Sequence, residues 1–212
     1  MYLPKHFEET RFEVLHELIR AHPLGTLVTL ASQGLDANHI PFEIDAAPAP
    51  FGTLRGHVAR ANPLAREPSR GVDALAIFHG PQAYVSPSWY PSKQETGKVV
   101  PTWNYAVVHA HGPLRIVDDR SWLRALVERL TRRHEAGRGA PWSVSDAPAE
   151  FIDAQLGAIV GIEMPIARLV GKWKVSQNRP PRDRAGAAEG LSQEGGDSAA
   201  AMADLVRRTL EE

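Results

Sequence analysis

No cysteine occurs in the 212 residues, so the chain has neither a disulfide framework nor a thiolate metal site. Long apolar runs are also missing: none approaches the roughly 20 residues of a membrane-spanning helix, and the first residues do not resemble a signal peptide. Neither sign of charge is in excess, since 24 Lys and Arg stand against 25 Asp and Glu. This balance provides no overall attraction to nucleic acid or to an anionic membrane. These absences predict a cytoplasmic protein with an ordinary hydrophobic core.

Short β-rich segments separated by turn residues occupy most of the chain between residues 25 and 175. We expect strands over residues 25–31, 38–44, 52–58, 73–78, 82–86, 104–117 and 156–175. Strands of this length and spacing are typical of an antiparallel barrel or sandwich. The predicted fold class is therefore mainly β (α+β), with peripheral helices.

Apolar residues at helical spacing predict helices as well as strands. We expect them over about 10–21, 119–135 and 147–155. Asp119 is suited to cap the second of these helices, and a closing helix begins near Ser198. The segment 180–197 is polar and glycine-rich, and we interpret it as a surface loop or a short helix.

The aromatic residues are concentrated between Tyr84 and Tyr105, a stretch that holds five of the nine Trp and Tyr residues. Pro87, Pro91 and Pro101 prevent this stretch from forming one continuous helix or central strand. A loop that carries rings with polar groups between them suits a flat ligand with polar edges, such as a flavin, a haem or a base. An ordinary aromatic-rich loop folded over the core is the alternative.

A candidate phosphate site lies where a predicted strand ends near His57. Asn62-Pro63 is suited to start a short helix, with Pro at the first helical position. Arg60, the His57 imidazole and the Asn62 amide, together with helix-end N–H groups, would hold a phosphate dianion. Gly56 permits close backbone approach. A solvated arginine beside a turn is the alternative.

Other chemistries have weaker support. Histidines on or near the predicted strands lack the spacing of a metal-binding motif, so we expect no metal site; they are His39, His57, His79, His109 and His111. No serine stands in a G-x-S-x-G elbow, which argues against a hydrolytic triad. The arginines of the predicted 119–135 helix form a modest basic patch, and a solvated helix face with ion pairs is the simpler interpretation.

Several segments resemble the PaiB-type family of FMN-binding negative transcriptional regulators, whose fold is similar to that of the split-barrel pyridoxamine-phosphate oxidases. They are NHIPFEI at 38–44, GHVARANP at 56–63, YVSPSWYPSK at 84–93, VPTWNYAVVHAHG at 100–112 and KWKVSQNRPPRDRAGAAEGL at 172–191. The resemblance implies an FMN-binding split β-barrel over residues 1–179, with 180–212 as a C-terminal loop and helix packed on the same domain. It also implies a homodimer with FMN between the subunits.

The resemblance further implies a set of cofactor-binding residues. Those expected along or beside the isoalloxazine ring are His39, Ile40, Pro41, Arg55, Gly56 and His57. Those expected at the phosphate are Arg60 and Asn62. Those expected to close the pocket, from the partner subunit, are Thr102, Trp103 and Asn104. Oxidases of this fold carry Ser-Arg-Lys at the phosphate, whereas this chain has Ala59-Arg60-Ala61-Asn62, with one cation in place of two. The resemblance assigns no role to the patch from Lys174 to Arg179.

Three functions remain open. A flavin-binding repressor follows from the family resemblance, although no helix-turn-helix pattern supports direct contact with DNA. An FMN-dependent oxidoreductase would use the barrel cleft to position a substrate against the flavin, and no residue stands out as its proton donor. A flavin or haem carrier would have neither role. The resemblance favours the repressor, with the oxidoreductase as the alternative.

Overall fold

The computed structural model describes residues 1–66 and 72–211. The chain forms two compact units, each described by itself. Unit 1 comprises Met1–Ala21, His79–Val108 and Val170–Glu212, and unit 2 comprises His22–Phe78 and His109–Leu169. No helix in the described part of the chain is long and apolar enough to cross a membrane.

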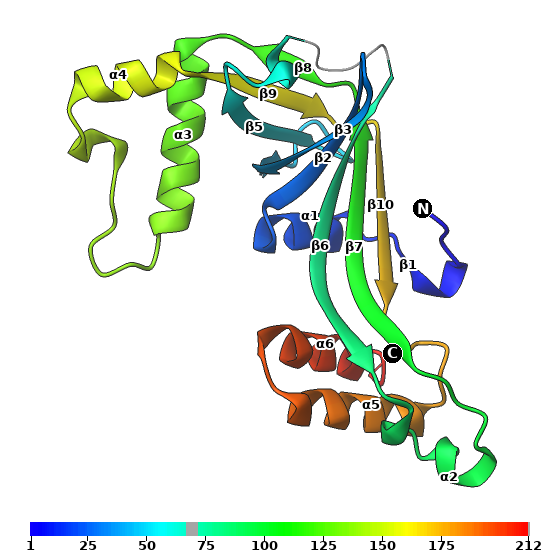
Figure 1. The fold of residues 1–212 in the computed structure, drawn as a ribbon. Coiled ribbons are helices and arrows are strands. Elements are labelled where there is room, and N and C mark those ends of the chain that lie inside the picture. The colour runs from blue at the N-terminus through cyan, green and yellow to red at the C-terminus, as the bar shows by residue number, and fades with distance from the viewer. Residues whose placement is uncertain (67–71, 212) are drawn as a thin grey trace. The chain divides into compact units, whose positions relative to one another are not determined.

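Unit 1 is a sheet with helices packed on it, and its strands occur in the order β1, β10, β7, β6 (Figure 1). The bounds of its strands, three of which also contribute residues to unit 2, are β1 (Glu8–Glu9), β6 (Ala74–Val85), β7 (Thr102–Gly112) and β10 (Arg168–Lys174). The bounds of its helices are η1 (Lys5–Phe7), α1 (Phe12–Ala21), η3 (Pro87–Trp89), α2 (Ser92–Thr96), α5 (Pro181–Glu194) and α6 (Asp197–Arg208).

Helix α1 packs directly against the sheet of unit 1 because two strand glycines admit its apolar face. Leu15 and Leu18 are buried on that face. A Cβ added to Gly171 would lie 2.2 Å from Leu15 Cδ2, and one added to Gly80 would lie 2.8 Å from Leu18 Cδ1. The apolar spacing that predicts this helix therefore also marks its buried side.

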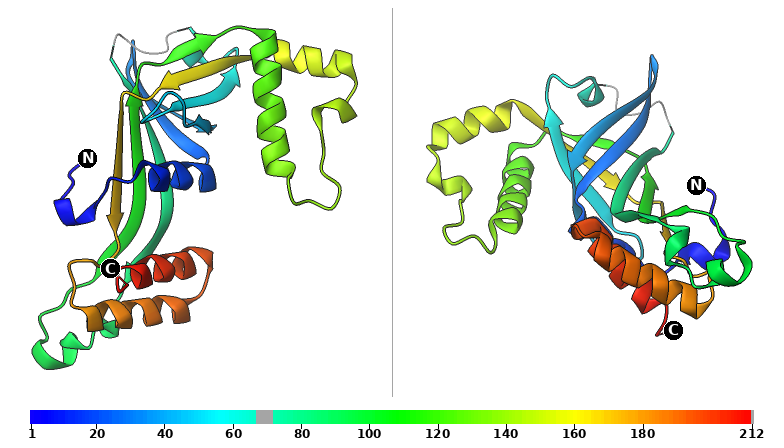
Figure 2. Two further views of the ribbon diagram at one scale, coloured as in Figure 1. Left: turned by 180° about the vertical axis from the view of Figure 1, so that it is seen from behind. Right: turned by 60° about the horizontal axis from the view of Figure 1, so that its bottom comes forward.

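Helices α5 and α6 lie side by side as a pair (Figures 1 and 2). Their shared apolar cluster is formed by Ala83, Val175, Ala188, Leu191, Met202, Ala203 and Val206. On another side of α5, Gly186 and Gly190 face Trp89 of η3. A Cβ on Gly186 would lie 2.1 Å from the backbone oxygen of Trp89, so the absence of a side chain brings α5 against η3.

Unit 2 contains a four-stranded antiparallel sheet in the order β4, β5, β9, β8, and a hairpin of β2 and β3 that pairs with the first part of β6. The bounds of its strands are β2 (Leu24–Ala31), β3 (Gly34–Pro41), β4 (Glu43–Asp45), β5 (Thr53–Ala59), β8 (Arg115–Val117) and β9 (Ile159–Pro165). The bounds of its helices are η2 (Pro63–Ala65), α3 (Arg120–Glu135), η4 (Val144–Asp146) and α4 (Ala149–Gly157).

Helix α3 covers one face of the four-stranded sheet. It begins as predicted at Asp119, whose side chain accepts a hydrogen bond of 2.9 Å from the Trp122 backbone N–H. Gly161 on β9 lies opposite His57 on β5, and a Cβ on Gly161 would lie 2.3 Å from the Trp122 ring. The glycine thus lets the indole of α3 rest on the sheet.

The structure corrects several predicted boundaries. The runs 73–78 and 82–86 are one strand, β6, which passes through Pro81. The run 104–117 is divided into β7 and β8 at Pro113, and the run 156–175 contains the end of α4, β9 and β10. The segment 180–197, expected to be a loop or short helix, contains the 14-residue helix α5. The closing helix begins at Asp197, and Ser198 instead exchanges two hydrogen bonds with the Gln82 backbone.

Candidate functional site

Strand β5 positions the centre of the candidate site because its side chains alternate between two faces. Leu54, Gly56 and Val58 are buried on one face. A Cβ on Gly56 would lie 3.0 Å from Ile40 Cγ2 and 3.3 Å from the Pro41 carbonyl oxygen, so this glycine allows the end of β3 to approach β5. The other face of β5 carries Arg55 and His57.

His57 opens into a cavity of about 320 Å³ between the strands and α3. Its wall is formed by Pro41, His57, Val127, Leu130, Thr131, His134, Glu135 and Trp142. The cavity combines aliphatic side chains and an indole with a few polar groups, as ligand pockets do. Its size lies at the lower end of the range of about 300–1,000 Å³ found for small-molecule sites.

The His57 ring carries an unused polar atom. Its Nδ1 is buried and has no hydrogen-bond partner among the described residues. Burial lowers the pKa of His57 below its ordinary value, so the ring is neutral near pH 7. A buried polar atom without a partner costs free energy, and the ring that carries this atom lines the cavity. We regard His57 as the anchor of the candidate site.

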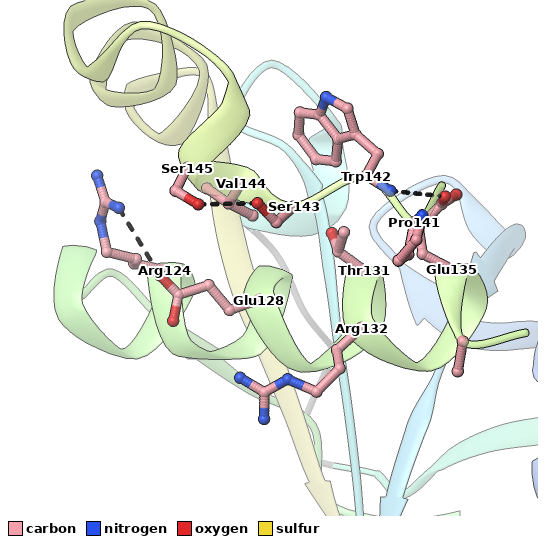
Figure 3. A pocket seen from close by; sticks show the side chains of 11 residues that line it. Arg124, Glu128, Thr131, Arg132, Glu135, Pro141, Trp142, Ser143, Val144 and Ser145 are labelled. Atoms are coloured by element: carbon pink, nitrogen blue, oxygen red, sulfur yellow. Dashed lines mark hydrogen bonds and ion pairs between the residues drawn. The ribbon is translucent and has the colours of Figure 1, made fainter. Parts of the chain in front are cut away.

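Trp142 also lines a second hollow, of about 410 Å³, between α3 and residues 141–145 (Figure 3). Both hollows are also lined by Thr131 and Glu135. The Trp142 backbone N–H donates a hydrogen bond of 3.1 Å to Glu135 Oε2, which ties the loop to the end of α3 (Figure 3).

The guanidinium of Arg55 is paired with two carboxylates. Its Nη1 donates to Asp45 Oδ2 at 2.9 Å and its Nε donates to Glu163 Oε2 at 3.0 Å. The backbone N–H of Ala47 and the Arg55 guanidinium lower the pKa of Asp45. Arg55 thus joins β4, β5 and β9, and its observed contacts are structural.

Arg60 is also paired, although it lies at the surface. Its Nη1 and Nη2 each donate to a different oxygen of Asp118 at 2.7 Å, and the same side chain donates to the carbonyl oxygens of Gly157 and Ile159. The hydrogen bonds and charge of Arg60 lower the pKa of Asp118. A carboxylate therefore stands where the sequence predicts a phosphate.

Asn62 starts the short helix η2, as its Asn-Pro sequence predicts. Its Oδ1 accepts a hydrogen bond of 2.9 Å from the Leu64 N–H, and its Nδ2 donates to Asn38 Oδ1 at 2.8 Å. A hollow of about 480 Å³ lies beside η2, but none of the buried unpartnered atoms of the described residues lines it.

His39 and Ile40, which were predicted to contact the isoalloxazine ring, differ in exposure. Ile40 is buried, whereas His39 is exposed and its Nδ1 lies 3.1 Å from Thr26 Oγ1. Of the residues predicted along the ring, Pro41 and His57 line the cavity. Ile40 and Gly56 instead lie against each other on the other side of β5, and His39 lies exposed on the hairpin.

The three residues predicted to close the pocket belong to unit 1. Lys174 Nζ donates to Thr102 Oγ1 and, at 2.6 Å, to the Trp103 carbonyl oxygen. Asn104 is buried and donates a hydrogen bond of 2.9 Å to Ser176 Oγ. The Trp103 side chain is 56% exposed and packs edge-on against Tyr84. Thr102 is thus held by the last residue of β10, Asn104 by the turn that follows this strand, and Trp103 faces solvent.

The residues of α3 that line the cavity were not assigned to the site from the sequence. Val127 and Leu130 appear in the sequence only as the apolar stripe of a helix, and Trp142 as an isolated ring. Two of the α3 arginines are engaged by carboxylates: Arg129 with Glu43 at 2.8 Å, and Arg124 with Asp153 at 3.4 Å. The predicted simpler interpretation, a helix face with ion pairs, is the one observed for these two side chains.

Comparison with protein families gives one match, which covers residues 1–168 and carries the description "Putative FMN-binding domain". A protein of Emericella nidulans is 36% identical over 242 residues, covering 98% of this chain and 96% of that protein. A Bacillus subtilis protein named protease synthase and sporulation protein PAI 2 is 30% identical over 213 residues, covering 99% of this chain and 98% of that protein.

Two solved structures have a similar fold. A flavocytochrome from Azotobacter vinelandii has a TM-score of 0.59 at 12% identity, covering 81% of this chain and 72% of that one. An FAD and heme binding protein from Mycobacterium smegmatis has a TM-score of 0.58 at 18% identity, covering 79% of this chain and 73% of that one. At these identities the likeness shows the fold alone. It confirms the predicted antiparallel split β-barrel with peripheral helices.

Proposed function

Because the chain belongs to the PaiB-type family of FMN-binding domains, and its cofactor is FMN, we propose that the isoalloxazine ring occupies the cavity between β5 and α3. The observation that carries this proposal is the buried, unpartnered Nδ1 of His57. The isoalloxazine has hydrogen-bonding atoms along one edge and an apolar ring system behind it. His57 would bind that edge, while Pro41 and Val127 would contact the ring.

For the phosphate we propose Arg60 and Asn62, as the family resemblance implies. Asp118 now holds the Arg60 guanidinium, but both side chains are exposed, at 45% for Arg60 and 59% for Asp118. Exposed ion pairs contribute little to stability, so a phosphate dianion can displace the carboxylate. Asp118 would then act as a competitor for the cofactor phosphate.

The fold also supports a homodimer with the cofactor at the subunit interface, which we propose as the assembled state. Trp103 and Tyr84 are 56% and 47% exposed and lie against each other, with ring centroids 6.2 Å apart. Large aromatic side chains are enriched at protein interfaces. In this proposal Thr102, Trp103 and Asn104 are presented to the second copy of the chain.

When bound, FMN would supply hydride or single-electron transfer, and the protein would position it and exclude water. We propose a regulator of the PaiB type, supported by the near end-to-end similarity to the Bacillus protein named for protease synthesis and sporulation. The pairing of Arg124 and Arg129 with carboxylates argues against α3 as a DNA-binding surface. An FMN-dependent oxidoreductase is the second candidate, because a neutral His57 in the cavity is suited to hold a proton for a substrate.

Titration of FMN into the apoprotein, followed by quenching of flavin fluorescence, tests the ring site. His57→Leu should weaken binding by about tenfold or more, since it removes the only polar side chain that β5 contributes to the cavity. Val127→Trp should block binding by filling the cavity. His79→Ala is the matched control, because His79 is exposed on β6 and does not line this cavity. Wild-type affinity in both cavity variants would contradict the assignment.

The phosphate site is tested by comparing FMN with riboflavin, which lacks the phosphate. Arg60→Gln should weaken FMN binding and leave riboflavin binding unchanged. Asp118→Asn should strengthen FMN binding alone, because it removes the competing carboxylate. Equal effects on both flavins would place the phosphate elsewhere.

The two roles are separated by two assays on the FMN-loaded protein. Bleaching of the flavin by NADH or NADPH under anaerobic conditions supports the oxidoreductase. A gel shift with promoter DNA that weakens steeply with salt supports direct repression. If the protein regulates transcription through its flavin, and α3 does not contact DNA, then replacing Arg120, Arg132 and Arg133 should leave any gel shift unchanged.

A further inference from the structure

Three cations gather in unit 1 without an acidic partner. Lys172 and Lys174 lie on the same side of β10, and their Nζ atoms are 5.3 and 6.0 Å from the centre of the Tyr105 ring. The guanidinium carbon of Arg179 lies 5.1 Å from the centre of the Tyr90 ring. Within residues 1–66 and 72–211, no carboxylate forms an ion pair with any of these three side chains.

The cluster is unusual because part of it is buried. Lys172 is only 8% exposed, and its Nζ donates a hydrogen bond of 3.1 Å to the Tyr2 carbonyl oxygen. Buried lysines are normally paired with an acid. Burial lowers the pKa of Lys174, and the positive charges of Lys172 and Arg179 lower it further. The like charges therefore repel one another across a small region of unit 1.

A buried hydroxyl without a partner lies beside these cations. Tyr90 is 2% exposed, and its hydroxyl forms no hydrogen bond of ordinary geometry with the described residues. Burial raises the pKa of Tyr90, while Arg179 and Ser176 act in the opposite direction, which places both groups near the hydroxyl. The two oxygens of the buried Asp183 carboxylate accept hydrogen bonds from Ser92, and neither forms an ion pair with Lys172, Lys174 or Arg179.

The turn after β10 sets the position of Arg179. Ser176 has a left-handed backbone with φ of 69°, and its carbonyl oxygen accepts a hydrogen bond of 2.9 Å from the Arg179 N–H. The Gln177 side chain binds the backbone of Trp173 and Val175, at 2.5 and 2.8 Å. Ser176 and Gln177 are thus committed to the turn, whereas the Arg179 guanidinium forms no ion pair with a carboxylate of the described residues and lies beside the Tyr90 ring.

We propose that Lys174, Arg179 and Tyr90 form an anion-binding site that takes a small molecule bearing a phosphate or carboxylate group. Arg179 offers a planar fork of N–H donors that no carboxylate of the described residues occupies and that matches two oxygens of such a group. Tyr90 adds a hydroxyl donor, and Lys174 retains N–H capacity beyond its bonds to Thr102 and Trp103. Lys172 contributes positive potential from behind the Tyr105 ring. A bound anion would neutralise the cluster and satisfy the Tyr90 hydroxyl.

Calorimetric titration of inorganic phosphate, and separately of malonate, into the protein in its FMN-loaded form and in its flavin-free form tests the site. We expect saturable binding of at least one anion. Arg179→Gln should weaken it by about tenfold or more, since a charge-assisted bidentate contact is lost, and Arg179→Lys should weaken it less. Arg182→Gln is the matched control: it removes the same charge from the same unit, but its guanidinium is already held by Glu95.

Two results would overturn the proposal: no saturable binding of either anion, or binding in Arg179→Gln that equals the wild type. Thermal unfolding of each variant establishes that it is folded, and Lys174→Gln provides a second variant with the same expected loss.

The same variants, titrated with FMN and riboflavin, identify the source of the anion. Loss of FMN affinity without loss of riboflavin affinity in Arg179→Gln would support an anion site here and assign it to the flavin phosphate, in place of Arg60. Unchanged affinity for both flavins, with phosphate or malonate binding lost, would support a separate ligand. No residue of the anion site lines the His57 cavity. If that cavity does not bind flavin, the anion titration can therefore still be interpreted in the same two ways.

Discussion

Replacing Gly186 with alanine should destabilise the protein, although alanine is the better helix former. Gly186 lies in α5, where its absent Cβ would sit 2.1 Å from the Trp89 carbonyl oxygen and 3.2 Å from Pro91 Cδ. Ordinary contacts between non-bonded heavy atoms fall at about 3.5–4.0 Å. The backbones of α5 and η3 must therefore separate by more than about 1 Å, and a main-chain oxygen cannot rotate away as a side chain can.

The expected magnitude is the difference between two opposing terms. Alanine is favoured over glycine in a helix interior by about 0.8–1.0 kcal/mol, whereas overpacking costs about 1–3 kcal/mol. We expect the upper part of that range because the opposing atom belongs to the backbone, which leaves a net loss of about 1–2 kcal/mol. Gly157→Ala is the control: its Cβ would lie no closer than 3.4 Å to the flexible Arg120 side chain. It should be neutral or stabilising by up to about 1 kcal/mol.

Urea unfolding followed by far-ultraviolet circular dichroism gives the free energies of both variants. The helix-propensity gain at Gly157, the last residue of α4, is at most that at Gly186. The difference between the two variants is therefore a lower bound on the cost of the overlap at Trp89, which is about 1–3 kcal/mol. A Gly186→Ala midpoint equal to or above that of Gly157→Ala would refute the packing of α5 against η3. Equal m-values would show that the two variants expose similar surface on unfolding.

Three further predictions concern unit 2 and assembly. Arg55→Met should lower the unfolding free energy by about 1–3 kcal/mol, because it leaves Asp45 and Glu163 without their cation; an unchanged urea midpoint would argue against that network. Burial lowers the pKa of His57 in the folded protein, so the unfolded chain binds the proton more tightly. The contribution of the neutral His57 ring to the free energy of unfolding is therefore full above about pH 6.5 and is lost as the pH falls through the pKa of the folded state. His57→Gln should therefore flatten the loss of stability measured between about pH 7.5 and about pH 5.5, and an identical profile in the variant would assign the loss to other groups. Trp103→Glu should convert a dimer into a monomer in light scattering, and a dimeric variant would move the interface away from Trp103.

Much of the secondary structure follows from local sequence patterns. The apolar spacing of Phe12, Leu15 and Ile19 predicts α1, and the short-range signals at Asp119 and Asn62-Pro63 predict where α3 and η2 begin. These predictions succeed because the interactions that decide them span only a few residues.

Helix α5 could not be predicted in the same way. Gly186 and Gly190 lower its helix propensity and are typical of loops, yet both are required where the helix meets Trp89. A contact about 100 residues away in the chain thus overrides the local preference.

The candidate site shows the same limit. Sequence and family resemblance indicate that His57, Arg60 and Asn62 belong to one region, and they do share unit 2. They do not reveal that Asp118, 58 residues away, occupies the Arg60 guanidinium, or that α3 supplies a wall of the cavity. Pairings between residues so distant in the chain depend on the fold and leave no local pattern.

The left-handed backbone at Ser176 limits which substitutions evolution can accept there. Glycine and asparagine enter this conformation readily, whereas valine, isoleucine and threonine resist it because they branch at Cβ. Homologues that keep an arginine three positions later should therefore show a small or amide-bearing residue at this place. A β-branched residue in such a homologue would indicate that the turn, and the direction of its arginine, has changed.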